Sequence, residues 1–261
     1  SGSDTGTLNL QITDAPVDDA QEVVIEFTGV EIKAADGETI VITYDTPKQI
    51  NLLALTGGVA ETIVDNQTLP AGQVEWIRLE VNEANSHITI DDAIYGLTIP
   101  SSAQTGLKLN RPITIAEGGT ASFTIDFDLR KSVHERQENN YMLRPTLRLI
   151  DNHTDGALHG TVASTTVSEN CMAGDKAAVY VYAGNVTADD VGSTVEPITT
   201  ASIDLANADA DYTVAFIPAG NYTAAFTCDA GQDDATTDDD ITFAGTQTVV
   251  ITAGLTTEQD F

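Results

Sequence analysis

The sequence has few basic residues, and its second part has almost none. It contains 11 Lys and Arg against 40 Asp and Glu. Residues 1–150 carry 22 acids and 10 bases, whereas residues 151–261 carry 18 acids and a single base, Lys176. Such a negative surface repels nucleic-acid phosphates and anionic lipid headgroups. We therefore expect no nucleic-acid partner.

Long apolar runs are also absent, since no stretch approaches the ~20 residues that a membrane-spanning helix needs. The first residues, SGSDTGT, have neither the basic nor the apolar region of a signal peptide. A small, polar beginning is typical of a processed secreted protein or of a tether after a lipidated cysteine. We expect an extracellular or outer-cell-surface protein that meets a membrane only through a removed or lipidated N-terminal anchor.

Cysteine is limited to Cys171 and Cys228, both in the more acidic part of the chain. A structural zinc site would need four ligands at closer spacing. The pair therefore predicts a disulfide.

The main pattern is an alternation of apolar and polar residues, interrupted by turn residues roughly every ten positions. Leu8, Leu10 and Ile12, for example, alternate with polar neighbours before an Asp-Ala-Pro breaker. Only residues 50–58 look briefly helical. The other predicted strands are 22–32, 39–44, 74–81, 86–90, 112–116, 120–127, 141–150, 157–165, 176–183, 199–205, 211–217, 221–228, 241–243, 246–252 and 255–261. The fold class predicted is all-β.

Polar residues and glycines interrupt this pattern at 149–160, which predicts two β-sandwich domains in tandem. The predicted parts are a flexible N-terminal tether (1–6), a first sandwich (7–150), a linker (151–156) and a second sandwich (157–261). A Pro-Ala-Gly turn occurs in each sandwich, at 69–72 and at 217–220. Proline presets φ and glycine accepts a left-handed conformation, so we expect both turns to be hairpin tips.

Four segments resemble the bacterial family called domain of unknown function 4382, over about residues 6–150. They are GTLNLQITDAPVDDAQEVVIEFTGVEI, LPAGQVEWIRLEV, IPSSAQTGLKLN and FTIDFDLRKSVHERQENNYMLRPTLRLI. Members of this family look like secreted or lipid-anchored surface proteins without an assigned activity. The later segment ADADYTVAFIPAGNYTAAFTC resembles prealbumin-like, or carboxypeptidase-regulatory-like, Greek-key sandwiches that serve as accessory modules. Neither resemblance implies catalytic residues.

No motif in the sequence predicts catalysis. Ser132, His134 and Glu135 are neighbours on one charged loop and cannot form the spatial geometry of a triad. Asp126 and Asp128 are spaced like paired carboxylates. They alternate with apolar residues, as Arg144 and Arg148 do further along, which favours surface ion pairs between strands over glycosidase carboxylates. We expect no enzyme and no catalytic residue.

The best candidate for ligand binding is the only tryptophan, Trp76, which shares a strand face with Arg78 and Glu80. Ile77 and Leu79 occupy the opposite face. An exposed indole beside polar side chains would form a stacking platform for a sugar ring. The alternative is that Trp76 covers the end of the sandwich or packs under the loop at 130–140.

Acidic residues are crowded between two predicted strands and could hold a cation. They are Asp233, Asp234, Asp238, Asp239 and Asp240, and a second loop adds Asn207, Asp209 and Asp211. Ca²⁺ is the expected ion because it takes six to eight oxygen ligands and tolerates flexible loops. The alternative is a solvated acidic loop without a cofactor.

The function expected from these patterns is that of a non-catalytic adhesion or ligand-binding module on a bacterial cell surface. Extracellular carbohydrate is the first ligand class to test. The alternative is a structural subunit that pairs edge strands with copies of itself. An unrecognised enzyme is the third possibility.

Overall fold

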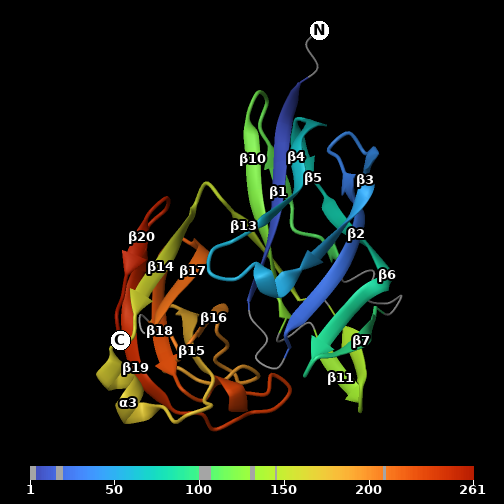
Figure 1. Cartoon of the computed structure of the whole chain (residues 1–261). Helices are drawn as coiled ribbons and strands as arrows, with labels where there is room; N and C mark the ends of the chain where they lie inside the picture. Colours follow the sequence, from blue (N-terminus) through green and yellow to red (C-terminus); the bar gives the residue numbers. More distant parts are fainter. Residues whose placement is uncertain (1–3, 16–19, 100–106, 130–132, 145, 208–209) are drawn as a thin grey trace. The chain divides into compact units, whose positions relative to one another are not determined.

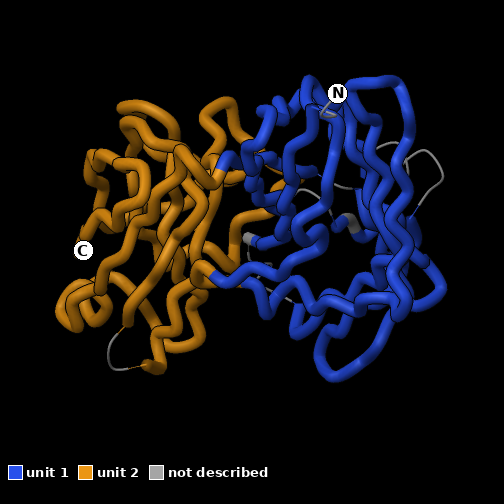
Figure 2. Tube along the Cα trace, turned by 90° about the horizontal axis from the view of Figure 1, so that it is seen from above, with its two compact units in different colours: residues 1–14, 20–55, 59–151 blue, residues 15–19, 56–58, 152–261 orange. Residues whose placement is uncertain are grey.

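The computed structural model describes residues 4–15, 20–99, 107–129, 133–144, 146–207 and 210–261. Strands dominate these residues, which confirms the all-β prediction (Figure 1). The chain divides into two compact units (Figure 2). Unit 1 comprises 1–14, 20–55 and 59–151, and unit 2 comprises 15–19, 56–58 and 152–261. Within the described ranges no helix has the length and apolar character needed to cross a membrane.

Unit 1 contains two larger sheets and a short strand pair. Its strands are β1 (Thr5–Ala15), β2 (Glu22–Lys33), β3 (Thr39–Asn51), β4 (Glu61–Pro70), β5 (Gly72–Val74), β6 (Trp76–Ile90), β7 (Ala93–Thr98), β8 (Lys108–Leu109), β9 (Ile113–Ile115), β10 (Thr120–Asp128), β11 (Val133–Gln137), β12 (Asn140–Leu143) and β13 (Leu147–Asp151), with a 3₁₀ helix η1 (Leu52–Ala54). One sheet has the order β13-β10-β1-β4. The other has the order β11-β12-β7-β6-β2-β3, with β8 paired to β6, and β5 pairs with β9.

The core of unit 1 lies between its two larger sheets. Phe27 of β2 meets Phe127 of β10 edge to face, with ring centroids 6.3 Å apart. Strand β2 has one extra residue against β6 at Thr28, a bulge that shifts the alternation by one position. Its apolar buried residues are Val23, Ile25, Phe27, Val30 and Ile32. The bulge therefore explains why a long strand keeps burying apolar side chains although the period changes.

Unit 2 contains two sheets and one short helix. Its elements are β14 (Asp155–Thr161), α3 (Ser164–Asn170), β15 (Ala177–Ala183), β16 (Thr199–Ile203), β17 (Asp211–Pro218), β18 (Gly220–Thr227), a 3₁₀ helix η2 (Ala230–Gln232), β19 (Phe243–Ile251) and β20 (Thr256–Glu258). The sheet orders are β17-β14-β20 and β16-β15-β18-β19. All pairings are antiparallel except that of β14 with β20.

Strand β15 is buried on both faces, and each face contributes to a different apolar cluster. Val179 and Val181 lie in the main core of unit 2, with residues from β14, β17, β18 and β19. Tyr180 and Tyr182, on the other face, lie in a second cluster that includes Val191. This second cluster is covered by the segments 184–198 and 228–242, which join strands of the same sheet.

The prediction that both Pro-Ala-Gly turns are hairpin tips is wrong. Strand β4 pairs with β1 and β5 pairs with β9, so the first turn connects different sheets. The second turn likewise leads from β17, in one sheet of unit 2, to β18 in the other. Gly72 and Gly220 do have positive φ values, of +125° and +156°. The positive φ at the glycine is thus present, but strand pairing depends on contacts distant in sequence.

Several other elements differ from the predictions. The predicted helix at 50–58 is not present: this range contains the end of β3 and only the short η1. Strands β4 and β7 and helix α3 were not predicted. Strand β1 already begins at Thr5, so Thr5 and Gly6 of the expected tether pair with Pro70 and Leu69. Only residues 152–154 separate β13 from β14. The division into tethered tandem domains at 151–156 stays a prediction.

Candidate functional site

Trp76 lies on the outward face of β6, as the alternation predicts. Trp76, Arg78 and Glu80 are half-buried, whereas Ile77 and Leu79 are buried on the opposite face. The Arg78 guanidinium carbon lies 5.3 Å from the Trp76 ring centroid. The ring is thus partly accessible beside a cation, and its role as a stacking platform stays a prediction.

A second cation reaches Trp76 from a strand that the sequence did not associate with it. Lys108 of β8 stands opposite Arg78 in the β6–β8 register, and its Nζ lies 4.6 Å from the indole centroid. A cation at this distance is attracted by the π-electrons of the ring. Lys108 went unpredicted because only the fold pairs β8 with β6.

Two carboxylates complete this surface, which we call the Trp76 face (Trp76, Arg78, Glu80, Glu31 and Lys108). Arg78 Nη1 lies 3.4 Å from Glu31 Oε2 on the neighbouring β2. Burial, and then the negative charge of Glu31, raise the pKa of Glu80 above its ordinary value, while Arg78 opposes the shift. The face thus combines an aromatic ring with hydrogen-bonding groups of both charges on paired strands.

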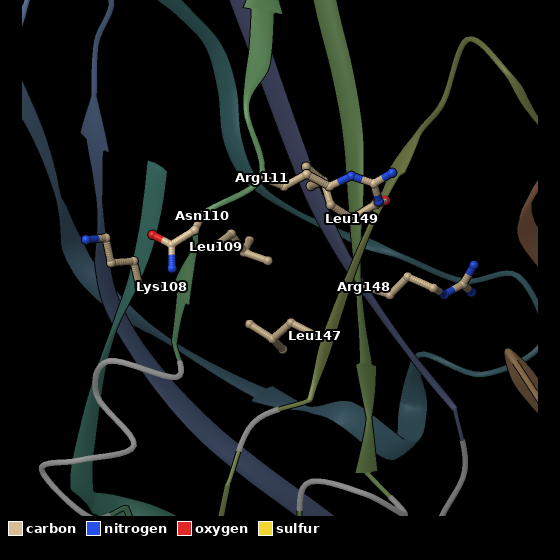
Figure 3. Close-up of a pocket in the computed structure, with 7 residues that line it drawn as sticks. All are labelled: Lys108, Leu109, Asn110, Arg111, Leu147, Arg148 and Leu149. Atoms are coloured by element: carbon tan, nitrogen blue, oxygen red, sulfur yellow. Dashed lines mark hydrogen bonds between the residues drawn. The ribbon is translucent and has the colours of Figure 1, made fainter. Parts of the chain in front are cut away.

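A pocket of about 390 Å³ continues from Lys108 (Figure 3). It is lined by Lys108, Leu109, Asn110, Arg111, Leu147, Arg148 and Leu149. In Figure 3, Leu109 and Leu147 point toward each other, whereas Lys108 and Arg148 extend away on opposite sides. Arg111 Nη1 donates a hydrogen bond of 3.2 Å to the Leu149 carbonyl. The lining therefore combines three leucines with one amide and three cationic side chains.

Asp126 and Arg148 do pair across β10 and β13, but the prediction of a surface ion pair is wrong. Arg148 Nη2 lies 2.9 Å from Asp126 Oδ2, and the Asp126 side chain is only 5% exposed. Strand β10 lies between β13 and β1, and residues 124–127 are buried on both of its faces. The ion pair is therefore largely shielded from water.

In unit 2 the segments 184–198 and 228–242 bring five aspartates together, which we call the aspartate cluster (Asp189, Asp190, Asp233, Asp238 and Asp239). One carboxylate oxygen each from Asp189, Asp190 and Asp238 lie within 4.8 Å of one another. The same holds for Asp190, Asp233 and Asp239. Asp190 thus belongs to both groups and joins them.

Two tyrosines of β15 hold the cluster against the sheet. Tyr180 Oη donates a hydrogen bond of 2.5 Å to Asp233 Oδ2, which also accepts from the Val191 backbone N–H at 3.1 Å. Tyr182 Oη donates to the Asp189 carbonyl and accepts from the Asp189 N–H. Because both tyrosine rings are buried, their hydroxyls hold the Asp233 carboxylate and the Asp189 backbone against β15.

Asp190 differs from the other four because it is completely buried, at 0% exposure. Its Oδ2 accepts the Asp239 N–H at 2.6 Å, whereas no donor among the described residues reaches its Oδ1. Burial, and then a side-chain hydrogen bond with Asp189 and the charges of Asp233 and Asp189, raise the pKa of Asp190 to about 6, whereas the Asp239 N–H opposes the shift. The protein therefore keeps a carboxylate oxygen dry and without a hydrogen-bond donor beside other carboxylates.

The predicted acidic residues divide between the cluster and other roles. Asp233, Asp238 and Asp239 belong to it, but Asp234, Asp240 and Asp211 belong to neither group of described residues. Asp234 accepts hydrogen bonds from Thr236, and Asn207 accepts one through its backbone in a turn. Asp209 lies outside the described residues. The sequence analysis missed Asp189 and Asp190. Their position as adjacent acids after a predicted strand was the available signal that they could join the later aspartates.

The predicted disulfide between Cys171 and Cys228 is present, with Cα atoms 5.3 Å apart. It links the residue that ends α3 to the residue that follows β18. Cys228 is buried in the main core of unit 2 with Tyr222, Ala224 and Phe226, as the alternation predicted.

Fold and sites define an all-β protein with a disulfide, a half-buried tryptophan beside cations and a buried aspartate cluster. The chain belongs to the family described as Domain of unknown function (DUF4382), which matches residues 5–145. This confirms the resemblance for the first part of the chain. None of the curated proteins matches the chain.

Some solved structures are similar at very low identity. The Bacillus anthracis TIE protein aligns with 98% of this chain and 34% of its own at 13% identity and a TM-score of 0.25, so this chain spans about a third of it. For GBS52, the minor pilin of Streptococcus agalactiae, the alignment covers 97% of this chain and 94% of the pilin, with 9% identity and a TM-score of 0.24. For a putative polysaccharide binding protein from Bacteroides thetaiotaomicron, the alignment covers 84% of this chain and 76% of that protein, with 9% identity and a TM-score of 0.20. TM-scores of this size do not define a shared fold, so the fold rests on the sheets described above.

Proposed function

We propose that this chain is a non-catalytic ligand-binding module of an extracellular or cell-surface protein, with extracellular carbohydrate as its ligand. The observation that carries the proposal is the Trp76 face, where Arg78 and Lys108 flank a half-buried indole. The division into two domains, and the likeness of residues 157–261 to prealbumin-like sandwiches, form part of the same proposal. The disulfide favours an oxidising, extracellular compartment.

The chemistry of the Trp76 face suits a sugar. An indole offers an apolar ring surface to the C–H side of a pyranose, and its polar edge tolerates water. Arg78 and Lys108 supply N–H donors to hydroxyl oxygens, while Glu31 and Glu80 supply acceptors. All five side chains stand on β6 or on β2 and β8, which each pair with β6, so little conformational entropy is lost when a ligand binds.

The pocket extends the surface available to a ligand. Lys108 both contacts Trp76 and lines the pocket, so a sugar chain stacked on the indole could place its next residue over Asn110. Lys108 and Arg111 are cations in a chain of formal net charge −29. A polysaccharide bearing uronic-acid carboxylates would therefore be attracted here although the protein as a whole is acidic.

A panel of neutral and uronic-acid polysaccharides tests the proposal with the intact chain and two variants. Trp76→Ala should weaken binding about tenfold or more, equivalent to ~1.4 kcal/mol. Tyr95→Ala is the matched control, because Tyr95 is also half-buried and packs on Tyr141 on β7 and β12 of the same sheet. Equal binding by Trp76→Ala and the unaltered protein, or no binding to any polysaccharide, would refute the proposal.

Strand β3 favours a second candidate function, assembly with copies of the same chain. β3 is the last strand of its sheet in the described part of the chain, and residues 39–44 (TIVITY) are uncharged, with Val41 58% exposed. An exposed β-branched edge strand is a template for a partner strand unless charge or proline prevents pairing, and on β3 these residues begin only at Asp45, followed by Pro47 and Lys48.

Mass photometry tests this assembly. If β3 pairs between copies, Val41→Lys should shift oligomers to monomers. Ile94→Lys should not, because Ile94, although even more exposed, lies on β7 inside the sheet. A monomeric unaltered protein at high concentration would exclude assembly through β3.

A further inference from the structure

We propose that the aspartate cluster of unit 2 binds Ca²⁺, and that the ion fastens segment 184–198 to segment 228–242. The proposal goes beyond carbohydrate binding, because none of its residues belongs to the Trp76 face or to the pocket. It depends on charge, on the burial of Asp190 and on the ligand chemistry of the cluster.

The first observation is uncompensated charge. The cluster gathers five carboxylates, and the only base of residues 151–261 is Lys176. Between described residues, no lysine or arginine forms an ion pair with Asp189, Asp190, Asp238 or Asp239. Carboxylates this close repel one another unless a cation or a proton lies among them.

The second observation is independent of the charge count and concerns Asp190. An acidic loop without a ligand normally turns its carboxylates to water, but Asp190 is 0% exposed. Its Oδ1 accepts no hydrogen bond from the described residues, although a buried polar atom almost always has a partner. A carboxylate of Asp190 lies within 4.8 Å of carboxylates from both segments. A cation at this position would be the missing partner.

The available ligand atoms are oxygens, which selects hard cations. Ca²⁺ takes six to eight oxygen ligands at ~2.3–2.6 Å with variable geometry, whereas Mg²⁺ demands a near-ideal octahedron at ~2.0–2.1 Å and gives up its water reluctantly. Ligands from two irregular segments, spaced up to 4.8 Å apart, fit the larger and more tolerant ion. Water completes the coordination on the side of Asp238, which is exposed.

The surroundings hold the ligands in place before the ion binds. Tyr180 and the Val191 N–H fix Asp233, Tyr182 fixes the backbone of Asp189, and Thr237 Oγ1 donates to Asp239 Oδ1 at 2.8 Å. Preorganised ligands lose less entropy on binding. A bound ion would in turn keep both segments packed over the second apolar cluster, which contains Tyr180 and Tyr182 of β15.

Thermal unfolding of the intact chain is the first test, with CaCl₂, MgCl₂ or EDTA, and with NaCl at matched ionic strength. A ligand that binds only the folded state raises the melting temperature, on the order of 10 °C at a hundredfold excess over the dissociation constant. Ca²⁺ should raise it more than either Mg²⁺ or the matched NaCl. An equal shift in NaCl and CaCl₂ would overturn the proposal.

Three substitutions locate the ion. Asp190→Asn should abolish the calcium-dependent shift. If that variant does not fold, Asp238→Asn serves instead, because Asp238 is exposed and should still weaken the shift. Asp240→Asn is the control, since it removes the same charge from the same segment but lies outside the cluster. A calcium shift that persists in both cluster variants, or disappears equally in Asp240→Asn, would overturn the site.

Terbium luminescence gives a reading that does not depend on stability. Tb³⁺ replaces Ca²⁺ at oxygen sites and is sensitised by nearby tyrosines, here Tyr180 and Tyr182. Emission should be lost in Asp190→Asn, retained in Asp240→Asn and displaced by excess CaCl₂. Failure of these experiments would leave carbohydrate binding at Trp76 untouched, and failure of the carbohydrate panel would leave them untouched.

Discussion

Replacing Cys171 and Cys228 together by alanine removes the covalent link between the end of α3 and the end of β18. Alanine is the suitable substitute because Cys228 is only 5% exposed in the core, where a serine hydroxyl would be buried. The disulfide joins residues 57 positions apart. In the chain-entropy relation a closed loop of this length stabilises the folded state by about 4 kcal/mol at 25 °C.

The loss should appear in two measurements. Urea unfolding of unit 2 should move to lower concentration, by on the order of 2 M for that free energy. Helix α3 should also exchange its amide hydrogens faster. It has seven residues, none of them buried, and its N-cap Ala163 gives no side-chain hydrogen bond. A helix this short and uncapped does not persist by itself.

Hydrogen exchange of the Val167 amide, which donates to the Ala163 carbonyl and is present in both proteins, reports the state of α3 directly. Met172→Ala is the control, because Met172 is 77% exposed beside the disulfide. A loss of less than about 1 kcal/mol, with α3 still protected, would refute the loop-entropy reasoning.

Three further predictions concern other parts of the chain. Hydrogen bonds, first from Asn85 and then from Asn82 and Gln49, lower the pKa of Glu26 below its ordinary 4.5 despite burial. The ionised Glu26 carboxylate therefore stabilises the folded state above pH 4.5, and this stabilisation is lost as the pH falls through the lower folded pKa. In urea titrations, the free energy of unfolding lost in Glu26→Gln should be smaller at pH 3 than at pH 7. A loss that stays constant with pH would contradict this. Gly192→Ala should destabilise unit 2 by ~1–3 kcal/mol more than Gly184→Ala does. The φ angle is positive at both glycines, but only at Gly192 would an added Cβ lie 2.7 and 2.8 Å from carbonyl oxygens. Equal losses of unfolding free energy in the two variants would disprove this. Phe127→Ala should cost ~3–5 kcal/mol, since Phe127 is fully buried against Phe27, and a loss below 1 kcal/mol in chemical denaturation would show that the site collapses.

Alternation predicted the positions of several strands, because period two is a local property of the chain. β2, β10, β17 and β18 lie within two residues of the predicted ranges. The helical interpretation of residues 50–58 failed because η1 is only the end of an extended strand. Helix α3 gave no signal, since STTVSEN has no apolar stripe and no capping side chain. Strand β15 was predicted, but its burial on both faces was not, because segments far along the sequence cover its second face.

The candidate sites follow the same division. Trp76, Arg78 and Glu80 share a face because they alternate on one strand, and this was readable from the sequence. Lys108 was not, because β8 joins β6 only in the folded sheet. In the aspartate cluster, the sequence indicated the crowding around Asp238, whereas the fold decided which carboxylates meet.

The sequence by itself determined the all-β class, the family of residues 5–145, the disulfide and the outward direction of Trp76. Each depends on neighbours along the chain or on the identity of two cysteines. The tertiary structure alone decided that the Pro-Ala-Gly turns change sheets, and that Asp190 is buried among four other carboxylates. Strand partners and the burial of loops depend on apolar surfaces meeting from distant parts of the chain. Local periodicity does not indicate which strands pair, because the same alternation fits a strand in either sheet.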